Sequence, residues 1–196
     1  MDRDNRSARP GRTSKRRIRC VLAVLALLGL GGCDDISIVE DQSTGLFSPE
    51  EYAHDAARGD IPVAVLGSAY GVSGERLARI VVEHMQGADW EPHARFTVAG
   101  EPTASRVYSY VLMFNGPLDV TSAALCAQAA HSAPMGEGAD ASKVRVVAGL
   151  CRDNKVATGV TARAGNISGI GDERFHTLIV AIAQALTRPN QQRIDR

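Results

Sequence analysis

Two segments of the chain carry apolar residues at the spacing of an amphipathic helix. Residues 73–86 begin at Ser73 and stop before Gly87, whereas residues 172–187 begin at Asp172 and stop before Pro189. Recurrence at i, i+3, i+4 and i+7 predicts one buried face for each helix. The two faces consist of Leu77, Ile80, Val81, His84 and Met85, and of Phe175, Leu178, Ile179, Ile182 and Leu186.

Two shorter helices are also predicted. Ser48 followed by Pro49 is typical of a helix start, with Glu51 three residues after the cap, and Gly59 ends this helix near Arg58. The second short helix covers residues 120–130, within a crossover that continues into a glycine-containing loop at 134–138.

Strands are predicted where apolar and polar residues alternate or where β-branched residues gather. Four such segments cover residues 94–98, 106–114, 143–151 and 155–163. The last two are separated by Arg152-Asp153-Asn154, which indicates a tight hairpin. Residues 61–66 predict a further extended segment, which Pro62 should confine to a sheet edge.

The order of these elements predicts an α+β fold in one domain, residues 48–188. We expect a mostly antiparallel sheet of four to five strands with the two amphipathic helices packed on one face. The polar, acidic residues 34–47 predict a tether, in which Ile36, Ile38 and Val39 could add a brief strand, and residues 189–196 predict a loose tail.

The first 33 residues have a different character. Eight Arg and Lys residues lie between Arg3 and Arg19, and the apolar run from Val21 to Gly32 has 12 residues. This run is too short for a helix that spans a bilayer, which needs about 20 apolar residues. A basic front, a short apolar core and small residues at the end are typical of a secretory signal peptide.

The end of this segment, Leu30-Gly31-Gly32-Cys33, resembles the lipobox of bacterial lipoproteins. The resemblance implies that a diacylglycerol is attached to the thiol of Cys33 and that residues 1–32 are removed. The new amine of Cys33 is then often acylated as well. Two or three acyl chains give stable attachment, whereas one gives only marginal binding. Residues 33–47 would form the lipidated N-terminus and tether.

Asp34 and Asp35 follow the predicted anchor directly. An acidic residue at this place resembles the signal that keeps lipoproteins of enteric bacteria in the inner membrane, so the inner membrane is favoured over the outer membrane. The rest of the domain resembles proteobacterial lipoproteins to which no activity is attached. This second resemblance implies no substrate.

Charge changes the picture once the signal is removed. The whole chain has a net charge of zero, but residues 1–32 contain eight basic and two acidic residues. The remaining 164 residues carry 14 basic and 20 acidic residues, a net charge of −6. An acidic domain argues against nucleic acid as a partner. It also favours a domain that does not itself bind an anionic membrane.

Four cysteines divide between these segments. Cys20 leaves with the signal and Cys33 is the predicted anchor, so Cys126 and Cys151 remain as an even pair. In an oxidising compartment such a pair predicts a disulfide. A reactive thiol is the alternative, but no basic partner motif lies near either cysteine.

No catalytic, metal or cofactor motif stands out. The histidines at 54, 84, 93, 131 and 176 show no local metal-ligand spacing, and no serine lies in a Gly-x-Ser-x-Gly turn. His84 is expected to be a boundary residue with a hydrogen-bond partner, and His176 a surface residue near Asp172. Four carboxylates surround Trp90 and could suggest glycan cleavage, but solvated loop charges explain them better: Glu83, Asp89, Glu91 and Glu101.

These observations favour a membrane-anchored periplasmic lipoprotein that is not an enzyme and needs no cofactor. Its domain would bind another envelope protein or help to organise the envelope. Two alternatives stay open. One is an envelope or cell-wall hydrolase whose site forms only in three dimensions, and the other is a module that binds a small ligand.

Overall fold

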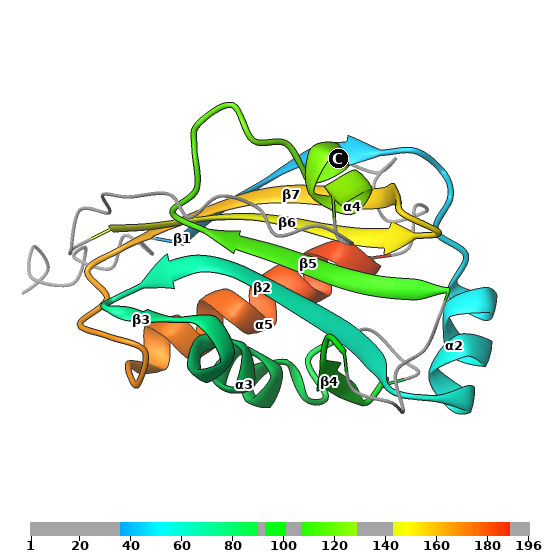
Figure 1. The fold of residues 1–196 in the computed structure, drawn as a ribbon, viewed down its shortest axis with the longest axis horizontal. Coiled ribbons are helices and arrows are strands. Elements are labelled where there is room, and N and C mark those ends of the chain that lie inside the picture. The colour runs from blue at the N-terminus through cyan, green and yellow to red at the C-terminus, as the bar shows by residue number, and fades with distance from the viewer. Residues whose placement is uncertain (1–35, 90–92, 101–106, 129–142, 189–196) are drawn as a thin grey trace, which may run out of the picture. The chain divides into compact units, whose positions relative to one another are not determined.

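A computed structural model describes residues 36–89, 93–100, 107–128 and 143–188. These residues form a single α+β fold in which seven strands make one mixed sheet (Figure 1). The strands are β1 (Ile36–Ser43), β2 (Ile61–Ala69), β3 (Val72–Ser73), β4 (Phe96–Val98), β5 (Tyr108–Phe114), β6 (Lys143–Arg152) and β7 (Lys155–Gly165). The described helices are α2 (Pro49–Arg58), α3 (Gly74–Met85), α4 (Ser122–Gln128) and α5 (Glu173–Thr187).

The α+β class and the predicted helices are confirmed, but the sheet has more strands than expected and is mixed, not purely antiparallel. Its order is β1-β7-β6-β5-β2-β3, with β4 also paired to β2. Strands β1, β7, β6 and β5 are antiparallel neighbours, whereas β2 runs parallel to both β5 and β4. The parallel pairs arise because α3 carries the chain from β2 back to the same end of the sheet, the connection that parallel strands require.

The prediction that Pro62 restricts its strand to an edge is wrong. Strand β2 lies inside the sheet, between β5 and β4. The Ile61 amide donates to the Arg95 carbonyl on the β4 side, so the nitrogen of Pro62 faces the β5 side. Pairing with β5 begins only at Val63. The nitrogen of Pro62 thus has no β5 residue to pair with, so the missing N–H costs no hydrogen bond of the sheet.

The segment predicted as a tether over residues 33–47 is largely part of the sheet. Residues Ile36–Ser43 form β1, which pairs antiparallel with β7 from Ile36↔Ala164 to Ser43↔Thr158. Further along, the Thr44 hydroxyl donates to the Val156 carbonyl at 2.7 Å, and Phe47 belongs to the core. The brief strand considered for this segment is thus eight residues long.

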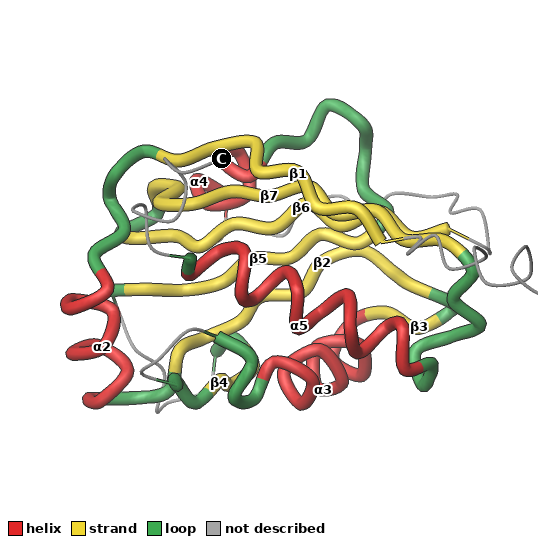
Figure 2. Tube along the Cα trace, turned by 180° about the vertical axis from the view of Figure 1, so that it is seen from behind, coloured by secondary structure: helices red, strands yellow, loops and turns green. Residues whose placement is uncertain are grey.

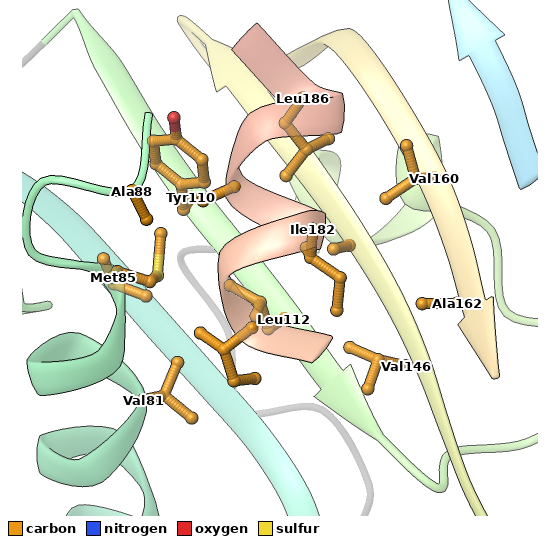
Figure 3. Packing of buried hydrophobic residues seen from close by; sticks show 14 of the residues in the cluster. Val81, Met85, Ala88, Tyr110, Leu112, Val146, Val160, Ala162, Ile182 and Leu186 are labelled. Atoms are coloured by element: carbon orange, nitrogen blue, oxygen red, sulfur yellow. The ribbon is translucent and has the colours of Figure 1, made fainter. Parts of the chain in front are cut away.

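The main core lies between the sheet and the helices α3 and α5, which pack on one face as predicted (Figure 2). Met85 and Val81 of α3 and Ile182 and Leu186 of α5 point toward the sheet, where Leu112 of β5 meets them (Figure 3). All five side chains are buried. Helix α4 lies on the opposite face over a smaller apolar cluster: Val111, Met113, Leu125, Cys126, Val147, Cys151 and Val156.

Local signals correctly placed the ends of several elements. Ser48 accepts the Glu51 amide at 3.3 Å and Asp172 accepts the Arg174 amide at 2.9 Å, so both residues cap their helices. Asp153 and Asn154 both have positive φ, 48° and 62°, as a type I′ turn between β6 and β7 requires.

Candidate functional site

The predicted lipidation residue Cys33 and the sorting residues Asp34 and Asp35 lie outside the described residues. Their roles stay predictions. In the described part of the chain, no helix is long and apolar enough to cross a bilayer.

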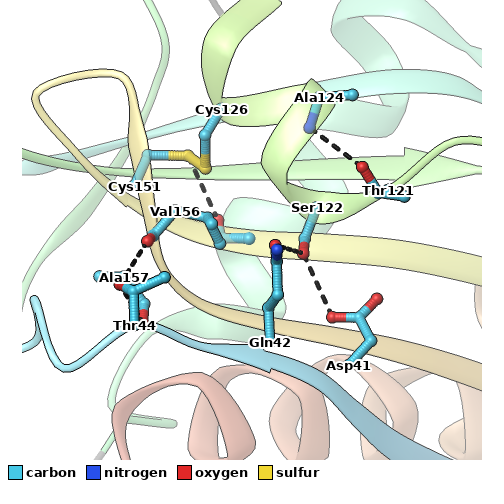
Figure 4. The surroundings of a disulfide bond; sticks show 11 residues. Asp41, Gln42, Thr44, Thr121, Ser122, Ala124, Cys126, Cys151, Val156 and Ala157 are labelled. Carbon is cyan, nitrogen blue, oxygen red and sulfur yellow. Dashed lines mark hydrogen bonds between the residues drawn. A yellow bond between two sulfur atoms is a disulfide. The ribbon is translucent and has the colours of Figure 1, made fainter.

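The predicted disulfide is present and joins Cys126 of α4 to Cys151 of β6. Their Cα atoms are 5.4 Å apart, within the range that a disulfide spans. Both residues are buried in the smaller apolar cluster. The bond therefore fixes the short helix α4 to the face of the sheet that α3 and α5 leave uncovered (Figure 4).

Two glycines allow this helix to lie close to the sheet. Gly149 of β6 and Gly159 of β7 are direct cross-strand partners. A Cβ atom on Gly159 would lie 2.0 Å from Ser122 Oγ, and one on Gly149 would lie 3.0 Å from Cys126 Sγ. Side chains at these two positions would push α4 away from the sheet, so the glycine pair explains why α4 docks here.

A bulge in β1 adds polar contacts at the same place. The register with β7 shifts between Glu40 and Gln42, so Asp41 is the extra residue. The Ser122 hydroxyl lies 3.2 Å from Asp41 Oδ1 and 3.3 Å from Gln42 Oε1, and the Thr161 hydroxyl donates to Asp41 Oδ2 at 3.1 Å. Ser122 is completely buried, and its hydroxyl serves to hold α4 against β1. Because Ser122 is completely buried, its hydroxyl is not exposed to a substrate.

Reduction of the disulfide should destabilise the domain by about 2–4 kcal/mol, because the free chain regains the entropy of a loop with a sequence separation of 25. Urea unfolding with and without reductant measures this difference. A variant with both Cys126→Ala and Cys151→Ala is the control and should not respond to reductant. Equal stability of the oxidised and reduced protein would contradict the expectation.

A buried polar network was missed by the sequence analysis. Asp89, expected among solvated loop charges, has a completely buried side chain. Its Oδ2 atom accepts the Tyr52 hydroxyl and the Ala94 amide, each at 3.0 Å, and the Tyr52 and Tyr110 hydroxyls lie 3.2 Å apart. Burial raises the pKa of both tyrosines, so both hydroxyls keep their protons as donors. The network joins α2, β5 and the chain that follows α3. The other oxygen of Asp89, Oδ1, is buried without a hydrogen bond and lies 3.4 Å from His93 Nδ1.

A pair of histidines was also missed. His84 of α3 and His176 of α5 face each other, with their Nδ1 atoms 3.2 Å apart. The expectation of a hydrogen-bond partner for His84 is confirmed, but that partner is His176. The other ring nitrogen of His84, Nε2, is buried without a hydrogen bond. One of the two Nδ1 atoms donates to the other in this contact.

Across the described ranges, no three His, Cys, Asp or Glu side chains come together as metal ligands do. Of the other carboxylates considered around Trp90, Glu83 lies exposed on α3, whereas Glu91 and Glu101 lie outside the described residues.

A glycine-rich turn over residues 165–171 leads into α5, and its hydrogen bonds show a structural role. Ser168 donates both its amide and its hydroxyl to Asp172 Oδ2, each at 2.8 Å. These hydrogen bonds lower the pKa of Asp172 to about 2. The carboxylate of Asp172 therefore already provides the negative charge that the N-terminus of α5 favours.

Comparisons with known proteins found no matching family model and no matching curated protein. Among solved structures, the chain is similar to a variant of the PelC dodecamer from Paraburkholderia phytofirmans. The TM-score is 0.42 at 14% identity, over 79% of this chain and 99% of that chain. PelC from the same organism in another crystal form gives a TM-score of 0.41 at 14% identity, with the same coverage.

Proposed function

We propose that this chain is a membrane-anchored lipoprotein of the bacterial cell envelope whose domain faces the periplasm. The observation that carries the proposal is Leu30-Gly31-Gly32-Cys33 behind a basic and apolar leader. The disulfide between Cys126 and Cys151 supports it, because such bonds persist in oxidising compartments such as the periplasm. Asp34 and Asp35 favour the inner membrane over the outer membrane.

The domain would act without catalysis, by binding another envelope protein or by organising the envelope. Two polar groups that could have served chemistry, Asp89 and Ser122, are buried and hydrogen-bonded to neighbouring groups of the protein. Their contacts hold elements of the fold together. This use of the polar interior supports a binding module.

Replacement of the anchor tests the proposal directly. Cys33→Ser should abolish incorporation of labelled fatty acid and leave a precursor that retains residues 1–32, because no thiol remains for the lipid. Mass analysis and metabolic labelling in the native host measure both effects. Cys20→Ser is the matched control, since Cys20 lies in the removed segment and should not affect labelling. Normal labelling and processing of Cys33→Ser would refute lipid anchoring.

Crosslinking of the wild-type protein in its native envelope tests the binding role. A defined envelope protein should be captured reproducibly, and the capture should fall when Cys33→Ser prevents attachment of the lipid. Turnover of a cell-wall substrate by the purified domain, with no captured protein, would instead favour the hydrolase alternative.

A further inference from the structure

The first strand of the domain begins only a few residues after the proposed anchor, Cys33. Strand β1 begins at Ile36, three residues after Cys33 along the chain. Three extended residues span at most about 11 Å. A lipid on Cys33 would therefore hold the first residue of β1 within about that distance of the head groups.

The strand register identifies what lies at this end of the sheet. Ile36 pairs with Ala164, Lys143 pairs with Gly165, and Phe114 pairs with Val146. The start of β1, the end of β7, the start of β6 and the end of β5 therefore share one end, at the left in Figure 1. We call this the anchor end of the sheet.

Three basic residues gather at the anchor end. Arg145 is directly opposite Arg163, and Lys143 lies two residues before Arg145 on the same face of β6. Neighbouring Val144 and Val146 point into the main core, so these cations belong to the face that also carries α4. Lys143 and Arg163 are exposed. Two like charges directly opposite each other are unfavourable within a sheet.

An exposed leucine lies beside these cations. Leu118, in the loop between β5 and α4, is 84% exposed. The Arg145 guanidinium donates to the carbonyls of Pro117 at 3.0 Å and Leu118 at 3.4 Å. These hydrogen bonds hold the loop against the cationic face, while Leu118 stays exposed. An apolar side chain next to Lys and Arg is the combination that bilayer interfaces bind.

We propose that Leu118, Lys143, Arg145 and Arg163 form a membrane-contact surface that rests on the anionic head groups next to the lipid anchor. This inference rests on the proposed function, since the anchor brings the surface to the bilayer. Asp41 and Asp119 offset part of the charge. The mature chain has a net charge of −6, so the domain as a whole is repelled by anionic lipids. The cations of this surface supply a local attraction to the anionic head groups.

The test uses the mature chain, residues 33–196, tethered chemically to vesicles. With Cys126 and Cys151 joined, Cys33 is its one free thiol, and it can be coupled to a maleimide lipid. Hydrogen exchange of the Gly116, Leu118 and Asp119 amides is compared on vesicles that contain phosphatidylglycerol and on vesicles of phosphatidylcholine alone. Exchange should be slower on the anionic vesicles by roughly twenty-five-fold, since each of the two exposed cations contributes a factor of about five. The effect should weaken in high salt.

Two charge-matched double variants locate the surface. Lys143→Glu with Arg163→Glu should remove the slowing, whereas Arg58→Glu with Lys155→Glu, exposed at the other end of the sheet, should retain it. Thermal unfolding confirms that both variants fold. Equal exchange on the two vesicle types, or equal loss in both variants, would overturn the proposal. The chemical tether replaces cellular lipidation, so a failure of Cys33 labelling in cells is a separate result.

Discussion

Gly67→Ala should lower the free energy of unfolding by about 2–5 kcal/mol, measured by urea denaturation. Gly67 ends the parallel pairing of β2 with β5, opposite Phe114. A Cβ atom there would lie 2.0 Å from the Phe114 carbonyl oxygen. This oxygen belongs to the backbone of the paired strand, so it cannot move aside as a flexible side chain could. The φ of Gly67, +78°, adds the strain of a left-handed conformation. Overpacking costs about 1–3 kcal/mol and the left-handed conformation about 1–2 kcal/mol.

Gly71→Ala separates the two causes. Gly71 has nearly the same backbone conformation, with φ +74°, but no atom lies within 4 Å of the position of its Cβ. Only the conformational strain remains there, about 1–2 kcal/mol. If both substitutions cost the same, the close approach of β2 to the Phe114 carbonyl does not contribute, and the explanation for Gly67 fails.

Elements with local signals could be predicted from the sequence. Helix α5 combines a capping residue, Asp172, with an apolar stripe, and both signals lie within the helix itself. The β6–β7 hairpin has its turn signal in Asp153 and Asn154, between two alternating strands. The residues that resemble a lipobox, Leu30 to Cys33, are likewise a local pattern, and the anchor that they predict does not depend on the fold.

Strand β1 and the parallel pairing of β2 depend on partners far along the chain. Ile36 meets Ala164, and a short acidic segment such as β1 gives no local sign of that partner. Strand β2 tolerates Pro62 because of where pairing with β5 begins, which is a property of the register. The pairing of these strands is determined by tertiary contacts, and local patterns in a single sequence do not reveal those contacts.

The cationic cluster of the proposed membrane-contact surface could not be predicted from the sequence, because it depends on a bulge between β6 and β7. A two-residue turn that pairs Arg152 with Lys155 would place Arg145 opposite Ala162 if the register continued unchanged. The register shifts by one residue between Leu150 and Cys151, so Arg145 meets Arg163 instead. The carbonyl of the extra residue, Ala157, accepts the Thr44 amide at 3.2 Å. A bulge of this kind turns later side chains of a strand to the other face.

The same fold separates two roles on the two faces of the sheet. Helices α3 and α5 cover one face and provide most of the apolar core. The other face carries α4, which the disulfide fixes near the β6–β7 hairpin. The same face carries the cationic residues, which lie at the anchor end. The proposed membrane contact is at the anchor end, whereas α2 and the β6–β7 hairpin lie at the other end of the sheet (Figure 1).

Phe175→Ala should lower the free energy of unfolding by about 3–5 kcal/mol, the usual cost of removing a buried phenylalanine ring. Phe175 is completely buried at the start of α5. Its ring centroid lies 6.0 Å from those of Phe114 and His84 and 6.2 Å from that of Tyr70. The ring thus joins α5 to α3 and to the ends of β5 and β2, and its loss leaves a cavity that these four elements cannot fill without moving.

Phe175→Leu and Thr177→Ala complete the measurement, again by urea denaturation. Leucine keeps part of the buried volume, so Phe175→Leu should cost clearly less than Phe175→Ala. Thr177 is exposed on the same helix, and its substitution should change stability by no more than about 0.5 kcal/mol. If Phe175→Ala behaved like Thr177→Ala, the packing of α5 against α3 could not be what holds this face of the sheet together.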